Sequence, residues 1–390
     1  TPFLMDNLTG ATEKSGGSFP HVSPYNNYMI ISPLPHFEIT DLVYWIFKRN
    51  EEQHFESTSY RSWYKSGAAG LAQICKFVAA EKSRTINIYL PGYFCGQTLN
   101  LLRSLPIQLH FYPLTSNLLP DYSFIRNLPT NKIIDVFLHI HYFGYISGQS
   151  HSREFADEHD AILVEDCAHV ISPLVHNDWV GDHVLFAPHK HFPLPHIGLV
   201  ISRSRIINKH VFASSYTLPM IWLLRNFLRA FLIRRNSSSW EQKWTSASKT
   251  YKYRQPSSLV TKAAESDLLN FKSASLQRSS NAYKLHNILS KISGWRPFPN
   301  YDPTTIPYVY CMICDTPDIS RRRYEALNRK YQLVMQWPDL PTELQEKSII
   351  YNQCIKLYDC LLCFFVHQKL DTDMWLTLLQ KTILAEGTKF

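Results

Sequence analysis

Residues 161–169 read AILVEDCAH, and this short stretch decides the fold that we expect. Its aliphatic run predicts a short buried strand, because apolar runs of this length with polar boundaries are typical of strands inside parallel sheets. Two adjacent acids, Glu165 and Asp166, close the strand. Acids in such a place need a partner, either as the cap of a following helix or within a functional site.

Outward from this strand, short apolar runs alternate with helical patterns between about residue 60 and residue 202. We expect strands at 85–90, 108–112, 133–141, 161–165 and 198–202, and helices at 68–81, 98–104 and 152–159. Aliphatic strands separated by helices predict an α/β fold, in which a mostly parallel central sheet carries helices on both faces. Ligands of such sheets bind outside the carboxyl ends of the strands.

The C-terminal third has a different pattern. A long helical pattern covers 259–290, and strands at 308–314 and 363–367 then mix with helices at 319–331 and 373–384. This mixture predicts a smaller C-terminal α+β domain. We therefore expect three parts: a flexible N-terminal arm at 1–20, a large domain at 21–258, and a linking helix with the small domain at 259–390.

A basic amphipathic helical insertion is expected near 216–250. Its core, residues 220–235, reads MIWLLRNFLRAFLIRR. Such a helix can lie on an anionic membrane surface, pack on the body of the protein or form a subunit interface, and the pattern leaves these alternatives open.

Composition narrows the class of protein. The 390 residues carry a formal charge of +8, but Lys and Arg are scattered, so we expect no nucleic-acid partner. No apolar run approaches the roughly 18 residues of a membrane span, and no secretory signal opens the sequence. Eight cysteines without such a signal indicate free thiols in a reducing compartment, so we expect a cytoplasmic protein, with peripheral membrane contact through 220–235 as an open alternative.

Two C-x-x-C spacings, Cys311/Cys314 and Cys360/Cys363, invite a zinc interpretation. Their flanks look like apolar strands, on which residues i and i+3 point to opposite faces and cannot share a metal. We therefore expect no metal site and interpret these cysteines as small buried hydrophobes.

Several further residues have the chemistry of a site, although each alone has a plainer explanation. The small residues Gly67 and Ala68 open a helix after Ser66 and can present N–H groups to a phosphate, or simply form a tight turn. The aromatic pair at 93 and 94 follows a strand and can equally belong to the core. Lys190 lies in PHKHFP between apolar runs, where a solvated loop lysine is the simple alternative.

The order of these residues along the chain is more informative than any one of them. The sequence runs through SGAAGL (66–71), LPGYFCGQT (90–98), HIHYFG (139–144), VEDCAHV (164–170) and GDHVLFAPHK (181–190). In this order the chain resembles the DegT–StrS sugar-nucleotide aminotransferases, a branch of the fold-type-I enzymes that use pyridoxal 5′-phosphate (PLP). Downstream, YKYR (251–254), WPDLP (337–341) and FFVHQ (364–368) also fit, as do Arg278 and Asn281 of the long helix, so the resemblance covers most of the chain from about residue 60 onward.

The resemblance implies a role for each matching residue. Lys190 would be the Schiff-base lysine and would move the proton during transamination, while Asp166 would bind the pyridine nitrogen of the ring. His169 would lie beside the ring, and Tyr93 or Phe94 would stack on it. Gly67 and Ala68 would meet the phosphate. Lys252 would reach the site of the neighbouring subunit, which implies a homodimer.

Three positions depart from the family pattern. Ala68 and Ala187 stand where the family has a hydroxyl residue, and Lys252 stands where it has Asn. Each missing charge-assisted hydrogen bond to the phosphate is worth roughly 1–3 kcal/mol, and the cation of Lys252 would restore part of this.

The function implied by the resemblance is transfer of an amino group, from glutamate, to a nucleotide-linked keto-sugar. A related possibility, PLP-dependent sugar dehydration, replaces the lysine with His in that family, and Lys190 argues against it. The alternative from another class is a non-catalytic binding or scaffold protein with a weakened phosphate site.

Overall fold

The computed structural model describes residues 35, 37–47, 60–127, 133–171, 179–203, 222–224, 256–269, 271–329, 331–347 and 349–386. The predicted arm at 1–20, Lys252 and nearly all of the predicted insertion at 216–250 lie outside these residues. Membrane contact through 220–235 therefore stays a prediction. No described helix combines the length and the apolar character that a membrane span needs.

A seven-stranded sheet is formed by residues 60–202, in the order β1-β7-β6-β5-β4-β2-β3. Its strands are β1 (Tyr60–Tyr64), β2 (Ile86–Pro91), β3 (Ile107–Tyr112), β4 (Val136–Ile140), β5 (Ile162–Cys167), β6 (His183–Phe186) and β7 (Gly198–Ser202). Strands β2 to β6 pair in parallel, whereas β7 pairs antiparallel with both β6 and β1. The predicted mostly parallel sheet is confirmed, with an antiparallel edge.

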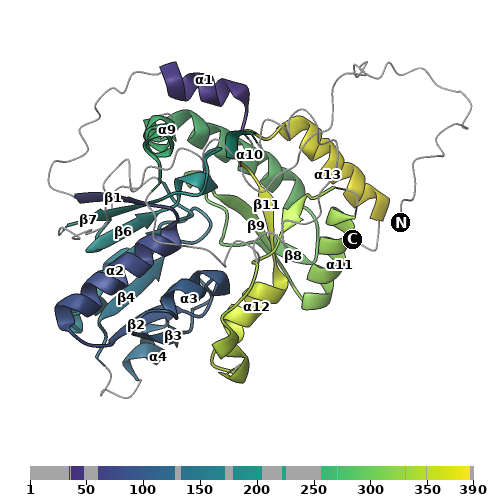
Figure 1. Cartoon of the computed structure of the whole chain (residues 1–390). Helices are drawn as coiled ribbons and strands as arrows, with labels where there is room; N and C mark the ends of the chain where they lie inside the picture. Colours follow the sequence, from purple (N-terminus) through teal and green to yellow (C-terminus); the bar gives the residue numbers. More distant parts are fainter. Residues whose placement is uncertain are drawn as a thin grey trace, which may run out of the picture. The chain divides into compact units, whose positions relative to one another are not determined.

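Helices cover both faces of this sheet, as predicted. On one face, α2 (Gly67–Lys82) and α3 (Gly96–Leu102) lie side by side in front of the strands (Figure 1) and share a core with Leu138, Val164 and Leu185. On the other face, α5 (Gln149–Glu158) packs on β4 and β5, and α9 (Ser258–Leu269) packs beyond it near β7. A short helix, α4 (Tyr122–Arg126), and an earlier one, α1 (Ile39–Phe47), complete this half.

A second, four-stranded sheet has the order β10-β11-β9-β8 and is antiparallel throughout. Its elements and flanking helices are α10 (Phe271–Leu289), β8 (Trp295–Pro297), β9 (Val309–Cys314), α11 (Pro317–Asn328), β10 (Val334–Met335), η3 (Thr342–Lys347), α12 (Asn352–Cys360), β11 (Leu361–Phe365) and α13 (Thr372–Glu386). The predicted C-terminal α+β arrangement is thus present. One core cluster contains residues from both sheets, such as Phe137 of β4 and Cys311 of β9.

The cysteines are all described and all free thiols, as predicted. Cys311 and Cys314 lie on β9, where their spacing places them on opposite faces. Cys311 instead faces Cys363 across β9 and β11, with the two sulfur atoms 3.4 Å apart. The expectation that Cys360 lies on a strand is wrong, because this residue ends α12 before the chain enters β11.

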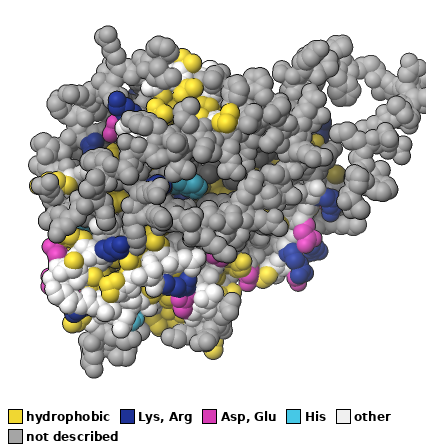
Figure 2. Space-filling view, in the orientation of Figure 1, with side chains coloured by type: hydrophobic (Ala, Val, Ile, Leu, Met, Phe, Trp, Pro, Cys, Tyr) yellow, Lys and Arg dark blue, Asp and Glu magenta, His cyan; other side chains and the backbone are white. Residues whose placement is uncertain are grey.

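Charged side chains do not gather into one basic surface on the face shown in Figure 2. Among the described residues visible there, Lys and Arg lie scattered between apolar and acidic side chains. Several arginines pair with acids, as Arg103 does with Glu343 and Arg126 with Glu158. The charge of the described surface is therefore partly compensated locally.

Candidate active site

The carboxyl ends of the parallel strands bring the predicted residues to one edge of the large sheet. Tyr93 and Phe94 follow β2, and Asp166 lies at the end of β5 with His169 three residues later. Lys190 ends the short 3₁₀ turn η1 (Pro188–Lys190), which follows β6. This arrangement arises because neighbouring parallel strands end at the same edge, where their loops line the ligand side of such folds.

Asp166 and Lys190 form the electrostatic centre of this edge. Both side chains are partly buried, and Asp166 accepts a hydrogen bond from the N–H of Ala168 at 2.8 Å. Burial raises the pKa of Asp166, and the positive charge of Lys190 opposes that rise. Burial likewise lowers the pKa of Lys190, against the negative charge of Asp166. The structure thus brings the two residues within each other's field, and their catalytic roles stay predictions.

His169 is held as a neutral ring. Its ring stacks on Tyr308 with the centroids 4.5 Å apart and an interplanar angle of 10°, and the Phe143 ring is inclined to it by 18° at a centroid distance of 6.0 Å. The N–H of Phe143 donates to Nδ1 of His169 at 3.4 Å, so the ring proton belongs on Nε2. Burial and the positive charges of Lys190 and His191 hold the pKa of His169 well below its usual value.

The two aromatic residues after β2 go to opposite faces of the sheet. Tyr93 is fully buried, with its ring 4.4 Å from that of Trp337 and its carbonyl oxygen accepting from the hydroxyl of Tyr142 at 2.6 Å. Phe94 is buried in the cluster beneath α2. Which of the two meets a ligand stays a prediction. The next residue, Cys95, lies near enough to Lys190 for the ionisation of its thiol to affect the pKa of that amine.

The sequence analysis did not predict that residues of the C-terminal half, Asp339 and Tyr308, lie beside the candidate site. Asp339 accepts hydrogen bonds from Cys95 Sγ at 3.4 Å and from Gly96 N–H at 3.0 Å. Tyr308 contributes its ring beside His169, and Lys190 Nζ lies 6.0 Å from the centre of that ring. The only sequence signal for these residues was the match of WPDLP to the small domain, which named no contact.

The N terminus of α2 packs against Gly198 at the start of β7, and the residue before Gly198 contacts the turn that carries Lys190. Ser66 caps the helix by accepting from the N–H of Ala69 at 3.2 Å. A Cβ on Gly198 would lie 2.5 Å from the carbonyl of Ser66 and 2.6 Å from the nitrogen of Gly67, so only glycine permits this approach. The carbonyl of the neighbouring Ile197 accepts from His189 Nδ1 at 2.8 Å, which ties the residue before β7 to η1.

This helix terminus is the predicted phosphate cradle. Gly67 and Ala68 form the first turn of α2, where the positive end of the helix dipole and the backbone N–H groups favour an anion. Ala187, the other position without a hydroxyl, is buried directly before η1.

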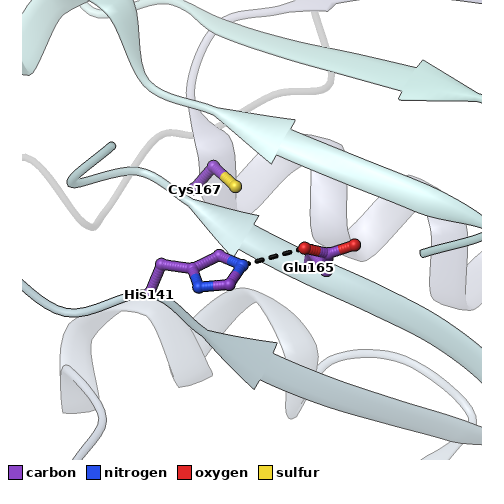
Figure 3. Close-up of side chains that lie close together, drawn as sticks. All are labelled: His141, Glu165 and Cys167. Carbon is purple, nitrogen blue, oxygen red and sulfur yellow. Dashed lines mark hydrogen bonds and ion pairs between the residues drawn. The ribbon is translucent and has the colours of Figure 1, made fainter. Parts of the chain in front are cut away.

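A second polar cluster lies on the opposite face of β5 (Figure 3). His141, Glu165 and Cys167 are all buried, and their potential ligand atoms lie within 4.8 Å of one another. However, Glu165 already accepts from His141 Nε2 at 2.8 Å, from Val180 N–H at 2.6 Å and from Gly181 N–H. Figure 3 shows the second ring nitrogen of His141 pointing away from the other two side chains. We therefore interpret the cluster as a hydrogen-bonded support for the 180–181 turn, without a metal.

Comparison with solved structures shows which fold this is. The chain superimposes on the aminotransferase PseC of Helicobacter pylori, which takes part in pseudoaminic acid biosynthesis, with a TM-score of 0.64 and 12% identity over 92% of this chain and 98% of that one. It superimposes on the aminotransferase TlmJ of Streptoalloteichus hindustanus with a TM-score of 0.59 and 16% identity over 90% and 92% of the two chains. A third match is the PLP-bound GDP-4-keto-6-deoxy-D-mannose-3-dehydratase of E. coli, with a TM-score of 0.58 and 14% identity over 83% and 87%.

The predicted fold, that of the fold-type-I PLP enzymes, is thus confirmed at the level of architecture. No protein-family model matches the chain, and no curated protein matches it either. At these identities the likeness establishes the fold, and the activity has to be argued from the site.

Proposed function

We propose that the chain is a PLP-dependent aminotransferase that transfers an amino group to a nucleotide-linked keto-sugar. The observation that carries this proposal is the Asp166–Lys190 pair, two oppositely charged and partly buried groups at the ligand edge of the sheet. The chain shares its fold with aminotransferases and with a dehydratase that binds PLP. Groups whose pKa values are shifted by burial and by a specific charge partner at such an edge are candidates for catalysis.

The residues present fit PLP. A bond to the aldehyde requires a neutral amine, and burial shifts Lys190 toward that form by lowering its pKa. Among the described residues Asp166 accepts one hydrogen bond, from the N–H of Ala168, so its carboxylate retains acceptor capacity for a ring N–H. The N terminus of α2 offers backbone N–H donors to a phosphate. It packs against Gly198, and the preceding Ile197 is hydrogen-bonded to His189 of η1. When bound, PLP would supply an electron sink for reactions next to its carbonyl carbon.

Each residue then has a defined task. Lys190 holds the cofactor and carries a proton on Nζ, while Asp166 keeps the proton on the ring nitrogen. His169 carries its proton on Nε2, because Nδ1 accepts from the N–H of Phe143, so Nε2–H is the ring atom that can donate to a ligand. The rings of Tyr308 and Trp337 limit the access of water from the C-terminal half.

Substrate, donor and assembly belong to the same proposal. The similar structures support a sugar substrate, since they include an aminotransferase of pseudoaminic acid biosynthesis and a GDP-sugar dehydratase. Glutamate as donor, and a homodimer in which Lys252 reaches the partner's site, follow from the family resemblance. Light scattering that gave only a monomer would contradict the dimer.

Two observations bear on the competing functions. Lys190 favours transamination over sugar dehydration, for which the resemblance implies His at this place. Ala68 and Ala187 favour the non-catalytic alternative, since neither can donate a hydroxyl hydrogen bond to a phosphate. A protein that kept the fold but bound PLP poorly would show this combination.

The deciding experiment uses purified full-length protein incubated with PLP. We expect an absorbance band of lysine-bound cofactor near the visible edge, a pyridoxyl label on Lys190 after borohydride reduction and peptide mapping, and conversion of the cofactor to its amine form by glutamate. Label on another lysine would contradict the site. Absence of binding at millimolar PLP would favour the scaffold function.

A further inference from the structure

Arg278 is a buried cation that links three segments around the candidate site. It lies on α10, and only 2% of its surface is exposed. Its guanidinium donates to Gln368 Oε1 at 3.1 Å, to the Tyr308 carbonyl at 3.2 Å and to the His191 carbonyl at 3.1 Å. Within the described residues no carboxylate accepts a hydrogen bond from it. Among the described residues, the oxygens that accept from this charge are all neutral.

The contact with His191 matters because this residue directly follows Lys190. Its carbonyl accepts a second hydrogen bond, at 2.8 Å, from Nε2 of Gln368. Arg278 and Gln368 both belong to the C-terminal half, so two donors from that half converge on one carbonyl of the lysine loop. The backbone of the turn makes short-range bonds, such as Lys190 N–H to the carbonyl of Ala187 at 2.9 Å, and the His191 side chain reaches the Ala168 carbonyl at 3.3 Å.

Stability alone explains this arrangement poorly. Burial lowers the pKa of Arg278 to about 10, so the group remains charged at neutral pH. A buried charge without an opposite charge is costly, and an apolar side chain of similar volume often stabilises a protein as well or better. The planar fork of arginine offers something else, namely fixed directions toward several oxygens at once.

We propose that Arg278 is a positioning residue for Lys190. Through the His191 carbonyl it fixes the lysine turn against the Tyr308 and Gln368 segments, so that the amine keeps its place beside Asp166. The same guanidinium holds Tyr308, whose ring borders His169, in register with that turn. This inference rests on the proposed function, because it assigns the cofactor to Lys190.

The property to be measured is how the reactivity of the Lys190 amine depends on pH in the cofactor-free protein. Its electrostatic environment in the described residues consists of Asp166, Cys95, His169, His189, His191 and His196. Substituting Arg278 by Met removes the fork at similar volume and leaves all six groups in place. Arg278→Met also removes a positive charge that acts on the adjacent His191, and this loss alone would raise the pKa of Lys190. Gln368→Leu removes a donor to the same carbonyl without changing any charge, so a shift in that variant reports the position and solvation of the amine.

The experiment measures the pH profile of amine labelling at Lys190, by peptide mass mapping, for wild type and Arg278→Met. Arg323 supplies the matched control, since it is also buried, donates to a carbonyl (that of Ser293, at 2.7 Å) and lies over an aromatic ring (Trp295, at 4.2 Å), but on α11. We expect the labelling midpoint to rise toward the ordinary lysine value in Arg278→Met and to stay unchanged in Arg323→Met. With PLP bound, kcat should fall roughly ten- to hundredfold at nearly constant KM, because a displaced group loses alignment rather than substrate binding.

Gln368→Leu keeps the test decisive if Arg278→Met does not fold. It removes the second donor to the same carbonyl, and we expect a smaller shift in the same direction. Wild-type labelling profiles in both variants, or an equal shift in Arg323→Met, would overturn the positioning role. A wild-type protein that does not take PLP at Lys190 would contradict the proposed function instead, and the labelling profile would still decide on the positioning.

Discussion

Two neighbouring acids on β5 experience opposite environments. Glu165, on one face, is buried and accepts from the His141 ring and from the backbone N–H groups of Val180 and Gly181. Burial alone would raise the pKa of Glu165, but these donors bring it below its ordinary value. Asp166, on the other face, has the one backbone donor of Ala168, and burial keeps its pKa raised.

This difference distinguishes a carboxylate that supports the fold from a carboxylate that a ligand can still bind. A carboxylate that is fully hydrogen-bonded inside the protein stabilises the fold and has nothing left for a ligand. A carboxylate that folding leaves under-satisfied costs stability, and a ligand can supply the missing partner. We therefore interpret the Glu165 face as the support of the sheet edge and the Asp166 face as the candidate site.

The largest expected effect comes from removing the cation that faces Asp166. In Lys190→Ala, turnover should fall by roughly three orders of magnitude or more, since the covalent attachment and the proton carrier are lost together. The absorbance band of lysine-bound cofactor should disappear, while circular dichroism stays native because a turn residue contributes little packing. An unchanged band would move the attachment to another lysine.

The isosteric pair Asp166→Asn and Glu165→Gln tests the comparison most directly. Asp166→Asn should lower turnover by about two orders of magnitude, since the ring nitrogen loses its anionic partner, and leave the free energy of unfolding unchanged or higher. Steady-state kinetics and urea unfolding on the same samples measure both. An equally strong loss of turnover in Glu165→Gln and Asp166→Asn would contradict the different roles that we assign to the two acids.

Glu165→Gln should instead lower the free energy of unfolding, by about 1–3 kcal/mol. An amide cannot serve the three donors as a carboxylate does, so at least one buried hydrogen bond weakens. Urea unfolding at neutral pH measures the loss, and residual turnover per folded molecule should stay near wild type. Equal stability of variant and wild type would show that the His141 pair is not the support we describe.

The sequence predicted the sheet well where single segments carry the signal. The aliphatic runs that became β2, β4, β5 and β7 were assigned within a few residues, because buried strands have a local pattern. It did not single out β1 or β6, since YRSWY lacks aliphatic residues and HVLF is only four residues long. These two strands are specified by their pairing with β7.

The residues of the candidate site likewise fall into a group that the sequence predicted and a group that it did not. Asp166 and Lys190 were predicted, because a strand end and a following turn are local features whose order matches a known family. Asp339, Tyr308 and Arg278 reach the site from segments far along the chain, so only tertiary packing brings them there. Cys95, which lies close enough to influence Lys190, was missed because the aromatic residues before it attracted the prediction of stacking.

The smallest expected effect is a difference in the pH dependence of stability. Because folding raises the pKa of Asp166 above its ordinary 3.8, the ionised form costs stability at neutral pH, and that cost vanishes as the pH falls toward 3.8. Because folding lowers the pKa of Glu165 below its ordinary 4.5, its stabilisation is complete above 4.5 and is lost as the pH falls through the folded value. Lowering the pH from 7 to about 4 should therefore remove any stability advantage of Asp166→Asn over wild type, while the deficit of Glu165→Gln shrinks only below about 4.5. Each change should be on the order of 1 kcal/mol, and urea unfolding of the cofactor-free proteins at stepped pH measures it. Parallel curves for the two variants would mean that both acids have the same environment, and the distinction between the two faces of β5 would fail.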